Sequence, residues 1–342
     1  MNFASDGVAY CAPEIMARIV ADNPVTTAVF DADEITAALK ERIEAMFESE
    51  VDIFTVATGS ASNSLALAAM TQPYGAILSH VEAHIQTDEC GAPEMITGGA
   101  KLIGLPGEHG KIDAATLEEA LKHSRFGFTH SVQPQALSLS QITEAGTVYT
   151  PDEMADLCRI AKSYGLKVHV DGARFANALA ALVCSPAELS WKAGVDILSL
   201  GATKNGAIAA EVIIVFDRSL SERLRYMRKR SGHMIAKNRL LALQLDTYLT
   251  DDLWLRNARH ANDMGRALES VLLRAPDIRL VHPRQANELF LVMPDDVLER
   301  MRKGGIKMYE NWRTYPLRHH RMATSFATTP QDIDRVAAIL GV

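Results

Sequence analysis

The sequence predicts an α/β protein, in which a large domain with a mainly parallel sheet precedes a smaller C-terminal α+β domain. Short apolar runs alternate with helical patterns through the middle of the chain, as in strand–helix–strand units. After about residue 217 the pattern changes to long helices followed by a few strands. The length of 342 residues is enough for two domains, which we expect over residues 1–240 and 241–342.

Local signals predict the individual elements. The helix at 150–164 has Thr150 as its N-cap, Pro151 at the first helical position and Glu153 to complete a capping box. The last helix has a similar start at Thr329. Alternating and continuous apolar runs predict strands at 51–56, 76–79, 101–105, 136–139, 166–170, 196–200, 211–217, 288–293 and 322–326. The other predicted helices span 60–70, 175–182, 233–249, 252–275, 295–303 and 330–340.

The composition excludes several classes of protein. Apolar residues make up 48% and charged residues 23% of the chain, which is typical of a folded globular protein and not of a disordered or fibrous one. The net charge of −7 disfavours a dedicated nucleic-acid or anionic-membrane binder. Apolar stretches such as 176–184 and 212–216 are far shorter than the ~18 residues that span a membrane.

The cysteines and the N-terminus indicate the compartment. Cys11, Cys90, Cys158 and Cys184 contain no CxxC pair, so we expect neither a disulfide framework nor a zinc site. The first ten residues lack a basic segment followed by an apolar one, so no signal peptide is expected. A reduced, cytoplasmic location is therefore predicted.

Ligands of open α/β sheets bind at the carboxyl ends of the strands, so the residues just after each predicted strand are the candidates for a site. After strand 51–56, the small residues 57–63 (ATGSASN) open a helix. Its free N–H groups and helix dipole could hold a phosphate, although a simple helix cap explains the same residues. No GxGxxG or Walker loop is present here, which disfavours dinucleotides and nucleoside triphosphates.

His84 comes shortly after the second strand. It could stack on a planar cofactor or act as an acid or base. The spacing of His80, His84 and Asp88 would also allow a metal site, and an ordinary surface or core histidine is a third interpretation.

Asp171 and Lys204 come after two later strands, one strand–helix–strand unit apart. A carboxylate there could be a helix N-cap, and a lysine could be an ordinary surface residue. At neighbouring strand ends, however, the pair would meet the needs of pyridoxal phosphate. The lysine would form an imine, the aspartate would keep the pyridine nitrogen protonated, and the helix N-terminus would hold the phosphate.

These residues resemble the L-threonine aldolase family, which are fold-type I pyridoxal-phosphate enzymes grouped with the β-eliminating lyases. The resemblance runs over nearly the whole chain, from Ser5 to Arg321. It is carried by residues 58–61 (TGSA), His84, 169–174 (HVDGAR) and 203–206 (TKNG). Residues 88–94 (DECGAPE) and 190–206 are most similar to the branch that includes L-phenylserine aldolase.

The resemblance implies a role for each site residue and a homodimer or homotetramer with its active site at the subunit interface. Lys204 would carry the cofactor, Asp171 would pair with its ring nitrogen and His84 would stack on the ring. Backbone and side-chain donors of Gly59, Ser60 and Ala61 would hold the phosphate, with Lys237 reaching it from the neighbouring subunit. The substrate α-carboxylate would be bound by Ser5, Arg174 and Arg321. No metal is expected.

Two positions depart from the family pattern. Glu144, in residues 142–146 (ITEAG), stands where many threonine aldolases carry a histidine, and Asp88 stands where an aromatic residue is frequent. Both are expected near the β-carbon of the substrate. The candidates for the base that takes the β-hydroxyl proton are therefore His84, Glu144 and Asp88.

The reaction that the resemblance implies is cleavage of an L-β-hydroxy-α-amino acid to glycine and an aldehyde. Threonine, allo-threonine and phenylserine are the expected type of substrate. Another fold-type I activity, such as transamination or β-elimination, is the nearest alternative because it would use the same lysine and aspartate. A non-catalytic binding protein on the same fold is an alternative of a different class.

Overall fold

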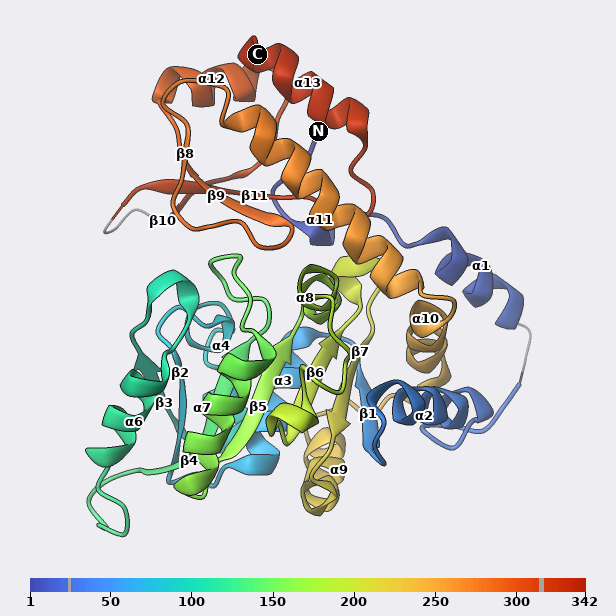
Figure 1. Cartoon of the computed structure of the whole chain (residues 1–342). Coiled ribbons are helices and arrows are strands. Elements are labelled where there is room, and N and C mark those ends of the chain that lie inside the picture. The colour runs from blue at the N-terminus through green and yellow to red at the C-terminus, as the bar shows by residue number, and fades with distance from the viewer. Residues whose placement is uncertain (24–25, 314–316) are drawn as a thin grey trace.

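The computed structural model describes residues 1–23, 26–313 and 317–342, and its two sheets confirm the predicted fold class (Figure 1). A seven-stranded sheet has the order β1-β7-β6-β5-β4-β2-β3. A second, antiparallel sheet of four strands has the order β10-β11-β9-β8. The strands of the large sheet are β1 (Asp52–Val56), β2 (Gly75–His80), β3 (Lys101–Leu105), β4 (Gln133–Ser140), β5 (Lys167–Gly172), β6 (Ile197–Gly201) and β7 (Glu211–Val215).

The large sheet is mainly parallel. The pairs β2–β3, β2–β4, β4–β5 and β5–β6 are all parallel, whereas β7 runs antiparallel to both of its neighbours, β6 and β1. The carboxyl ends of β1, β2, β4, β5 and β6 therefore lie along one edge of the sheet, where the predicted site residues begin.

Alternation along β5 determines which side chains reach each face of the sheet. Val168 and Val170 belong to the larger hydrophobic core, with α7 (Pro151–Ser163) and α8 (Phe175–Leu182). His169 and Asp171 point to the opposite face, which α3 (Gly59–Met70) covers. Figure 1 shows the sheet between α7 and α3.

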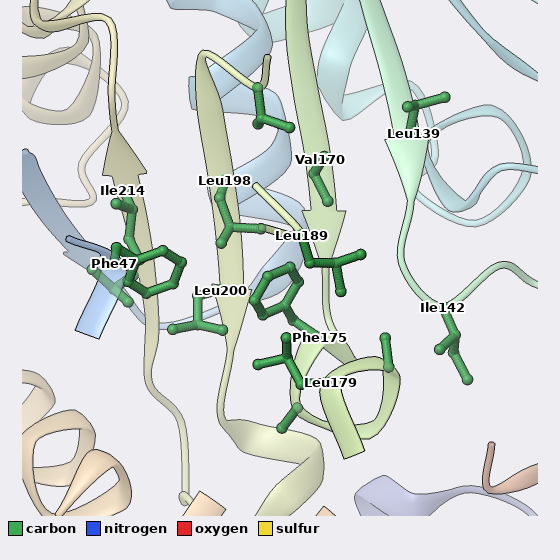
Figure 2. Packing of buried hydrophobic residues seen from close by; sticks show 14 of the residues in the cluster. Phe47, Leu139, Ile142, Val170, Phe175, Leu179, Leu189, Leu198, Leu200 and Ile214 are labelled. Carbon is green, nitrogen blue, oxygen red and sulfur yellow. The ribbon is translucent and has the colours of Figure 1, made fainter. Parts of the chain in front are cut away.

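Phe175 is one of the anchors of the larger core. Figure 2 shows its ring among Leu179, Leu189 and Leu200, beneath the end of β5. Its ring centroid also lies 6.3 Å from that of Phe47, so the start of α8 is packed from two sides. This packing holds the turn after Asp171 in place.

The helices around the large sheet differ in several places from those that the sequence predicts. Residues 233–238 were expected to be helical, but the structure has a non-helical segment there. The segment begins at His233, whose N–H donates to the Arg228 carbonyl at the end of the preceding helix. The next helix starts only at Arg239. The remaining helices of this part are α1 (Pro13–Asp22), α2 (Glu34–Phe47), α4 (His84–Thr87), α5 (Ala92–Thr97), α6 (Ala114–Lys122), α9 (Ser221–Arg230) and α10 (Arg239–Leu249).

The small sheet and three helices surround a second core, above the large sheet in Figure 1. Phe3 packs in this core, and the Phe3 amide donates to the Lys307 carbonyl, so the start of the chain lies with the C-terminal part. The last strand was predicted at 322–326 and lies earlier. The elements are α11 (Leu253–Leu272), β8 (Arg279–Leu280), β9 (Glu288–Val292), α12 (Asp295–Lys303), β10 (Tyr309–Arg313), β11 (His319–Ala323) and α13 (Pro330–Leu340).

Helix α11 connects the two cores. Trp254 and Ala258, near its start, pack in the larger core, and Leu268 and Leu272, near its end, pack in the smaller one.

The predicted domain boundary near residue 240 remains a proposal. None of the described helices is both long and apolar enough to cross a membrane. The four cysteines are free thiols.

Candidate active site

A cavity of about 530 Å³ lies at the carboxyl edge of the large sheet, and its walls include residues of the small sheet. Ala61 and Lys237 are the two predicted site residues that do not line it. Ala61 is buried and its amide donates to the Thr58 hydroxyl (3.2 Å), while Lys237 is exposed on the surface. The other predicted residues all line the cavity: Ser5, Gly59, Ser60, His84, Asp88, Glu144, Asp171, Arg174, Lys204 and Arg321.

Asp171 is the penultimate residue of the buried β5 and is held ionised. Its Oδ2 accepts a hydrogen bond from the Asn63 side chain (2.8 Å), and its Oδ1 accepts one from the Ala173 amide (3.0 Å). Burial alone would raise the pKa of Asp171, but nearby positive groups, His84 first among them, outweigh it and lower the pKa. Asp171 is therefore a fixed negative charge at the pocket floor.

His84 begins the short helix α4 and is tied to Asp171 through two buried side chains. Its Nδ1 lies 2.8 Å from Glu89 Oε1, and the same oxygen accepts a hydrogen bond from Asn63 Nδ2 (2.9 Å). The hydrogen bond to Glu89 is the main cause that raises the pKa of His84. Asn63 thus bridges the two carboxylates and fixes the His84 ring relative to Asp171.

Glu144 lies in the loop after β4, where the family resemblance placed it. Its Oε1 accepts hydrogen bonds from the His84 amide (2.8 Å) and the Ser140 hydroxyl (3.1 Å). Its Oε2 is buried and has no hydrogen-bond partner among the described residues. Burial, followed by the negative charge of Asp171, raises the pKa of Glu144 to about 7. A carboxyl with this pKa can accept and release a proton near neutral pH.

Lys204 lies in a single turn of 3₁₀ helix directly after β6. Within the described part of the chain, its ammonium group has no hydrogen bond or ion pair with another side chain. Glu211, at the start of the antiparallel β7, lines the cavity nearby and accepts a hydrogen bond from the Ala202 amide (3.1 Å). Burial raises the pKa of Glu211 to about 7, and the charge of Lys204 opposes that rise.

The N-terminus of α3 forms an open cradle beside these groups. Thr58 caps the helix by accepting from Ala61, which leaves the amides of Gly59 and Ser60 at the helix end. A Cβ placed on Gly59 would meet no atom within 4 Å, so the space beside it is open. An anion could therefore approach both amides, but not the Ala61 amide.

Two arginines and two carboxylates meet on the other side of the cavity. Arg174 donates to both oxygens of Asp6 (2.6 and 3.0 Å). Burial alone would raise the pKa of Asp6, but the charge and hydrogen bonds of Arg174 hold it well below its usual range. Glu288, from the small sheet, lies 3.0 Å from Arg174 and 3.6 Å from Arg321. The guanidinium of Arg321 also stacks on Trp312, 4.1 Å from the ring centroid.

The metal site that the spacing of His80, His84 and Asp88 would have allowed does not form. His80 is engaged elsewhere, because its Nε2 contacts the Gly107 carbonyl and its Nδ1 accepts from the Glu82 amide. Asp88 is exposed at the rim and accepts from the Thr87 hydroxyl. His84, Glu89 and Asp171 do lie within 4.8 Å of one another, but these groups already share the hydrogen bonds described above.

Sequence reasoning missed the residues that hold the predicted ones in place. The lone amide of Asn63 in a helix of small and apolar residues was one available signal, and an acidic residue at the first position of two buried strands, Glu211 and Glu288, was another. Asp6 and Glu89 gave no comparable signal, because their partners are distant in the sequence or depend on a turn.

The donors present fit pyridoxal phosphate. Asp171 is a buried, ionised carboxylate suited to a pyridinium nitrogen, Lys204 is an amine without a polar partner among the described residues, and Gly59 opens a cradle at a helix N-terminus. The sequence matches the family described as Beta-eliminating lyase over residues 2–296, so the chain belongs to that family. It is a pyridoxal-phosphate-dependent carbon–carbon lyase.

Comparison with individual relatives indicates a more specific family among the β-eliminating lyases. The low specificity L-threonine aldolase of Pseudomonas aeruginosa is 40% identical over 336 residues, which cover 98% of this chain and 94% of that protein. The low specificity L-threonine aldolase of a Pseudomonas species is 39% identical over 309 residues, which cover 90% of this chain and 88% of that protein. The structure of Leishmania major threonine aldolase superposes with a TM-score of 0.93 at 28% identity, and the match covers 99% of this chain and 98% of that one. The chain is therefore a member of the threonine aldolase family, as the sequence analysis expected.

More distant structures share the fold alone. Serine palmitoyltransferase of Sphingomonas wittichii has a TM-score of 0.73 at 12% identity, covering 99% of this chain and 86% of that one. Enzymes of different activity thus have the same architecture, so the fold cannot identify the reaction without the site residues.

Proposed function

We propose that the protein cleaves L-threonine and related L-β-hydroxy-α-amino acids, including allo-threonine and phenylserine, to glycine and an aldehyde. The observation that carries this proposal is the convergence of three groups in one cavity: the amine of Lys204, the ionised carboxylate of Asp171 and the carboxyl of Glu144, whose pKa is about 7. The names of the relatives support it.

Each group has a distinct task in this proposal. When bound, pyridoxal phosphate supplies an electron-accepting ring for the pair released as the Cα–Cβ bond breaks. Lys204 holds the cofactor, and Asp171 holds a proton on its ring nitrogen. Arg321 binds the α-carboxylate and so orients the bond to be broken. Glu144 takes the proton of the β-hydroxyl, directly or through a water molecule, as the aldehyde forms.

Glu144 fits the role of base better than the other two candidates. The exposed Asp88 lies at the rim of the cavity, and the His84 ring is already engaged with Glu89 through Nδ1. Glu144 has a buried oxygen, Oε2, without a hydrogen-bond partner among the described residues. We therefore propose His84 as the residue that faces the cofactor ring.

A second subunit would complete the site in this proposal. Lys237 does not line the cavity of its own chain and is exposed on the surface. A lysine in that position could approach the phosphate of a neighbouring chain. A homodimer or homotetramer, and a cytoplasmic location, remain proposals.

A product assay tests the proposed function. The purified protein, loaded with pyridoxal phosphate, should release glycine and an aldehyde from threonine, allo-threonine and phenylserine with no keto acid present. Turnover that requires a keto-acid acceptor would indicate a transaminase instead, and ammonia with a keto acid would indicate β-elimination. Substrate binding without any product would favour the non-catalytic alternative.

Replacing Glu144 tests the assignment of the base. Glu144→Gln should lower the rate of cleavage by about 100-fold or more, which is the usual contribution of a positioned base. Exchange of the glycine α-proton, which involves no β-hydroxyl, should survive better. The rise of the cleavage rate through pH 7 should also be lost, because a group with a pKa of about 7 has been removed. The rates of both reactions are measured over pH 5–9.

The stability of the variant provides a second readout. The pKa of Glu144 rises on folding from 4.5 to about 7, so the stability due to the protonated form is present below pH 4.5 and is lost as the pH rises through 7. Glu144→Gln should therefore show a smaller drop in Tm between pH 5 and 8 than the wild type. Glu119→Gln, on an exposed helix face, is the matched control. If cleavage and proton exchange fall together, Glu144 is not the base.

Replacing Arg321 tests the carboxylate-binding side. Arg321→Lys keeps the charge but loses the planar donor fork and the stacking on Trp312. We expect KM for threonine to rise about tenfold or more, with the affinity for pyridoxal phosphate unchanged. Titrating the apoenzyme with pyridoxal phosphate measures the affinity for the cofactor. An equal loss of both affinities would place Arg321 at the phosphate or in the structural framework.

A further inference from the structure

Glu211 is a buried carboxyl between the two parts of the cavity that are expected to hold the cofactor. It is the first residue of the antiparallel β7 and pairs in register with Val56 of β1 and Gly201 of β6. Residues that face each other in an antiparallel pair have their Cα atoms about 5 Å apart. Val56 leads into the cradle at the N-terminus of α3, and Gly201 leads into the turn that carries Lys204. Glu211 therefore lies beside the cradle as well as beside the lysine.

Hydrogen bonds and close packing hold the Glu211 carboxyl at this wall of the cavity. Only 6% of the residue is exposed, yet it lines the cavity together with Gly59 and Ser60 of the cradle. Its Oε2 accepts a hydrogen bond from the Ala202 amide (3.1 Å). A Cβ on Gly201 would lie 3.0 Å from the same oxygen, so the glycine makes room for the carboxyl. The carboxyl is thus fixed next to the space that a phosphate in the cradle would occupy.

The surroundings of Glu211 compensate a negative charge only weakly. Among the described residues it has no ion pair, and the titratable groups that face it are Lys204, on the turn after β6, and Tyr248, on α10. Burial raises the pKa of Tyr248, so its phenol is neutral, and the register partners Val56 and Gly201 carry no charge. Burial outweighs the charge of Lys204 and raises the pKa of Glu211 to about 7.

We propose that Glu211 belongs to the phosphate side of the cofactor site and takes up a proton when the phosphate of pyridoxal phosphate binds. A phosphate monoester carries a charge of about −1.5 to −2 at neutral pH. An ionised carboxylate beside it would repel it, at a place where water provides little screening. A protonated carboxyl instead has an O–H that can donate to a phosphate oxygen. The proton comes from the solvent, and no other bond changes.

This proton uptake sets a pH limit on the binding of the phosphate. Below pH 7 most of the empty sites already carry the proton, because the pKa of Glu211 is about 7. Above pH 7 the empty site holds an ionised Glu211, so the affinity for the phosphate should fall about tenfold for each unit of pH. The phosphate group itself titrates near pH 6, below this range. The inference does not depend on which amino acid the enzyme cleaves.

The alternative is that Glu211 stays ionised and acts on Lys204 alone. Its charge would then be compensated by Lys204, or by Lys237 of a neighbouring chain, and the phosphate would bind without a proton. Pyridoxal distinguishes the two roles, because it can form the same link to Lys204 but has no phosphate. Groups that act on the ring or on the link affect both ligands, so their titration cancels in the ratio of the two affinities.

The experiment therefore compares pyridoxal phosphate with pyridoxal. The full-length apoenzyme is titrated with each ligand between pH 7 and 9, for the wild type, for Glu211→Gln and for the surface control Glu119→Gln. In the wild type and the control, the affinity for pyridoxal phosphate relative to pyridoxal should fall about tenfold from pH 7.5 to 8.5. In Glu211→Gln it should stay constant, because the amide does not ionise and can still accept from the Ala202 N–H. The same fall in a Glu211→Gln variant with a wild-type-like Tm would overturn the proposal.

Calorimetry on the wild type keeps the proposal testable even if the variant does not fold. At pH 8, the heats of binding in two buffers of different ionisation enthalpy give the number of protons that each ligand brings with it. Pyridoxal phosphate should take up about one proton more than pyridoxal. Equal proton uptake by the two ligands would refute the role of Glu211. Failure of the proposed function is recognised separately: the cofactor would then bind as described, but the loaded enzyme would release no aldehyde from threonine.

Discussion

Lys204→Ala is expected to lower the rate of threonine cleavage by roughly 1,000-fold or more, because the amine both holds the cofactor and exchanges it with the substrate. The side chain lies just beyond the end of β6 and has no polar partner among the described residues. Its removal breaks no hydrogen bond or ion pair among the described residues, so the fold should be retained, and the pKa of Glu211 should rise further without the opposing charge. Pyridoxal phosphate should bind the variant weakly and without a covalent link.

Borohydride reduction followed by mass spectrometry measures that link directly. The wild type should carry the cofactor on the peptide that contains Lys204, and the variant should carry none. Lys192→Ala is the matched control, since Lys192 pairs with Glu48 on the surface. A reducible link that persists in Lys204→Ala would show that another lysine holds the cofactor.

The residues at strand ends could be predicted from the sequence because the signal is local. The alternation Val168, His169, Val170, Asp171 indicates a strand buried on both faces that ends in a charge. A parallel sheet then brings Asp171 and Lys204 to one edge without any knowledge of side-chain contacts. The family resemblance added Ser5 and Arg321, which are separated too widely in the sequence from Asp171 and Lys204 for spacing to relate them.

The residues that hold this set in place could not be predicted in the same way. Asp6 and Glu288 contact Arg174 only after the small sheet has packed over the large one. Asn63 bridges two carboxylates across the space between a helix and a strand. Such contacts depend on tertiary packing, and a single sequence gives no periodicity for them.

Asp171→Asn is expected to leave the fold intact and to lower the rate of cleavage by several orders of magnitude. The amide can still accept a hydrogen bond from the Ala173 N–H, so the turn after β5 keeps its main contact. The charge that protonates the ring nitrogen is lost, and each unit of pKa lost corresponds to about 1.4 kcal/mol. Cofactor should still be attached through Lys204. The Tm, the amount of bound cofactor and the cleavage rate are measured together with those of the exposed control Asp156→Asn.

The pH dependence of the residual activity distinguishes loss of this charge from a general distortion of the site. The charge of Asp171 is the second cause, after burial, that raises the pKa of Glu144 to about 7, and it also contributes to the raised pKa of His84. Without it, Glu144 should ionise more readily, so the rise in residual cleavage should move from about pH 7 to lower pH. A distorted site would lose activity without that shift. Wild-type activity in Asp171→Asn would exclude the pairing with the ring nitrogen altogether.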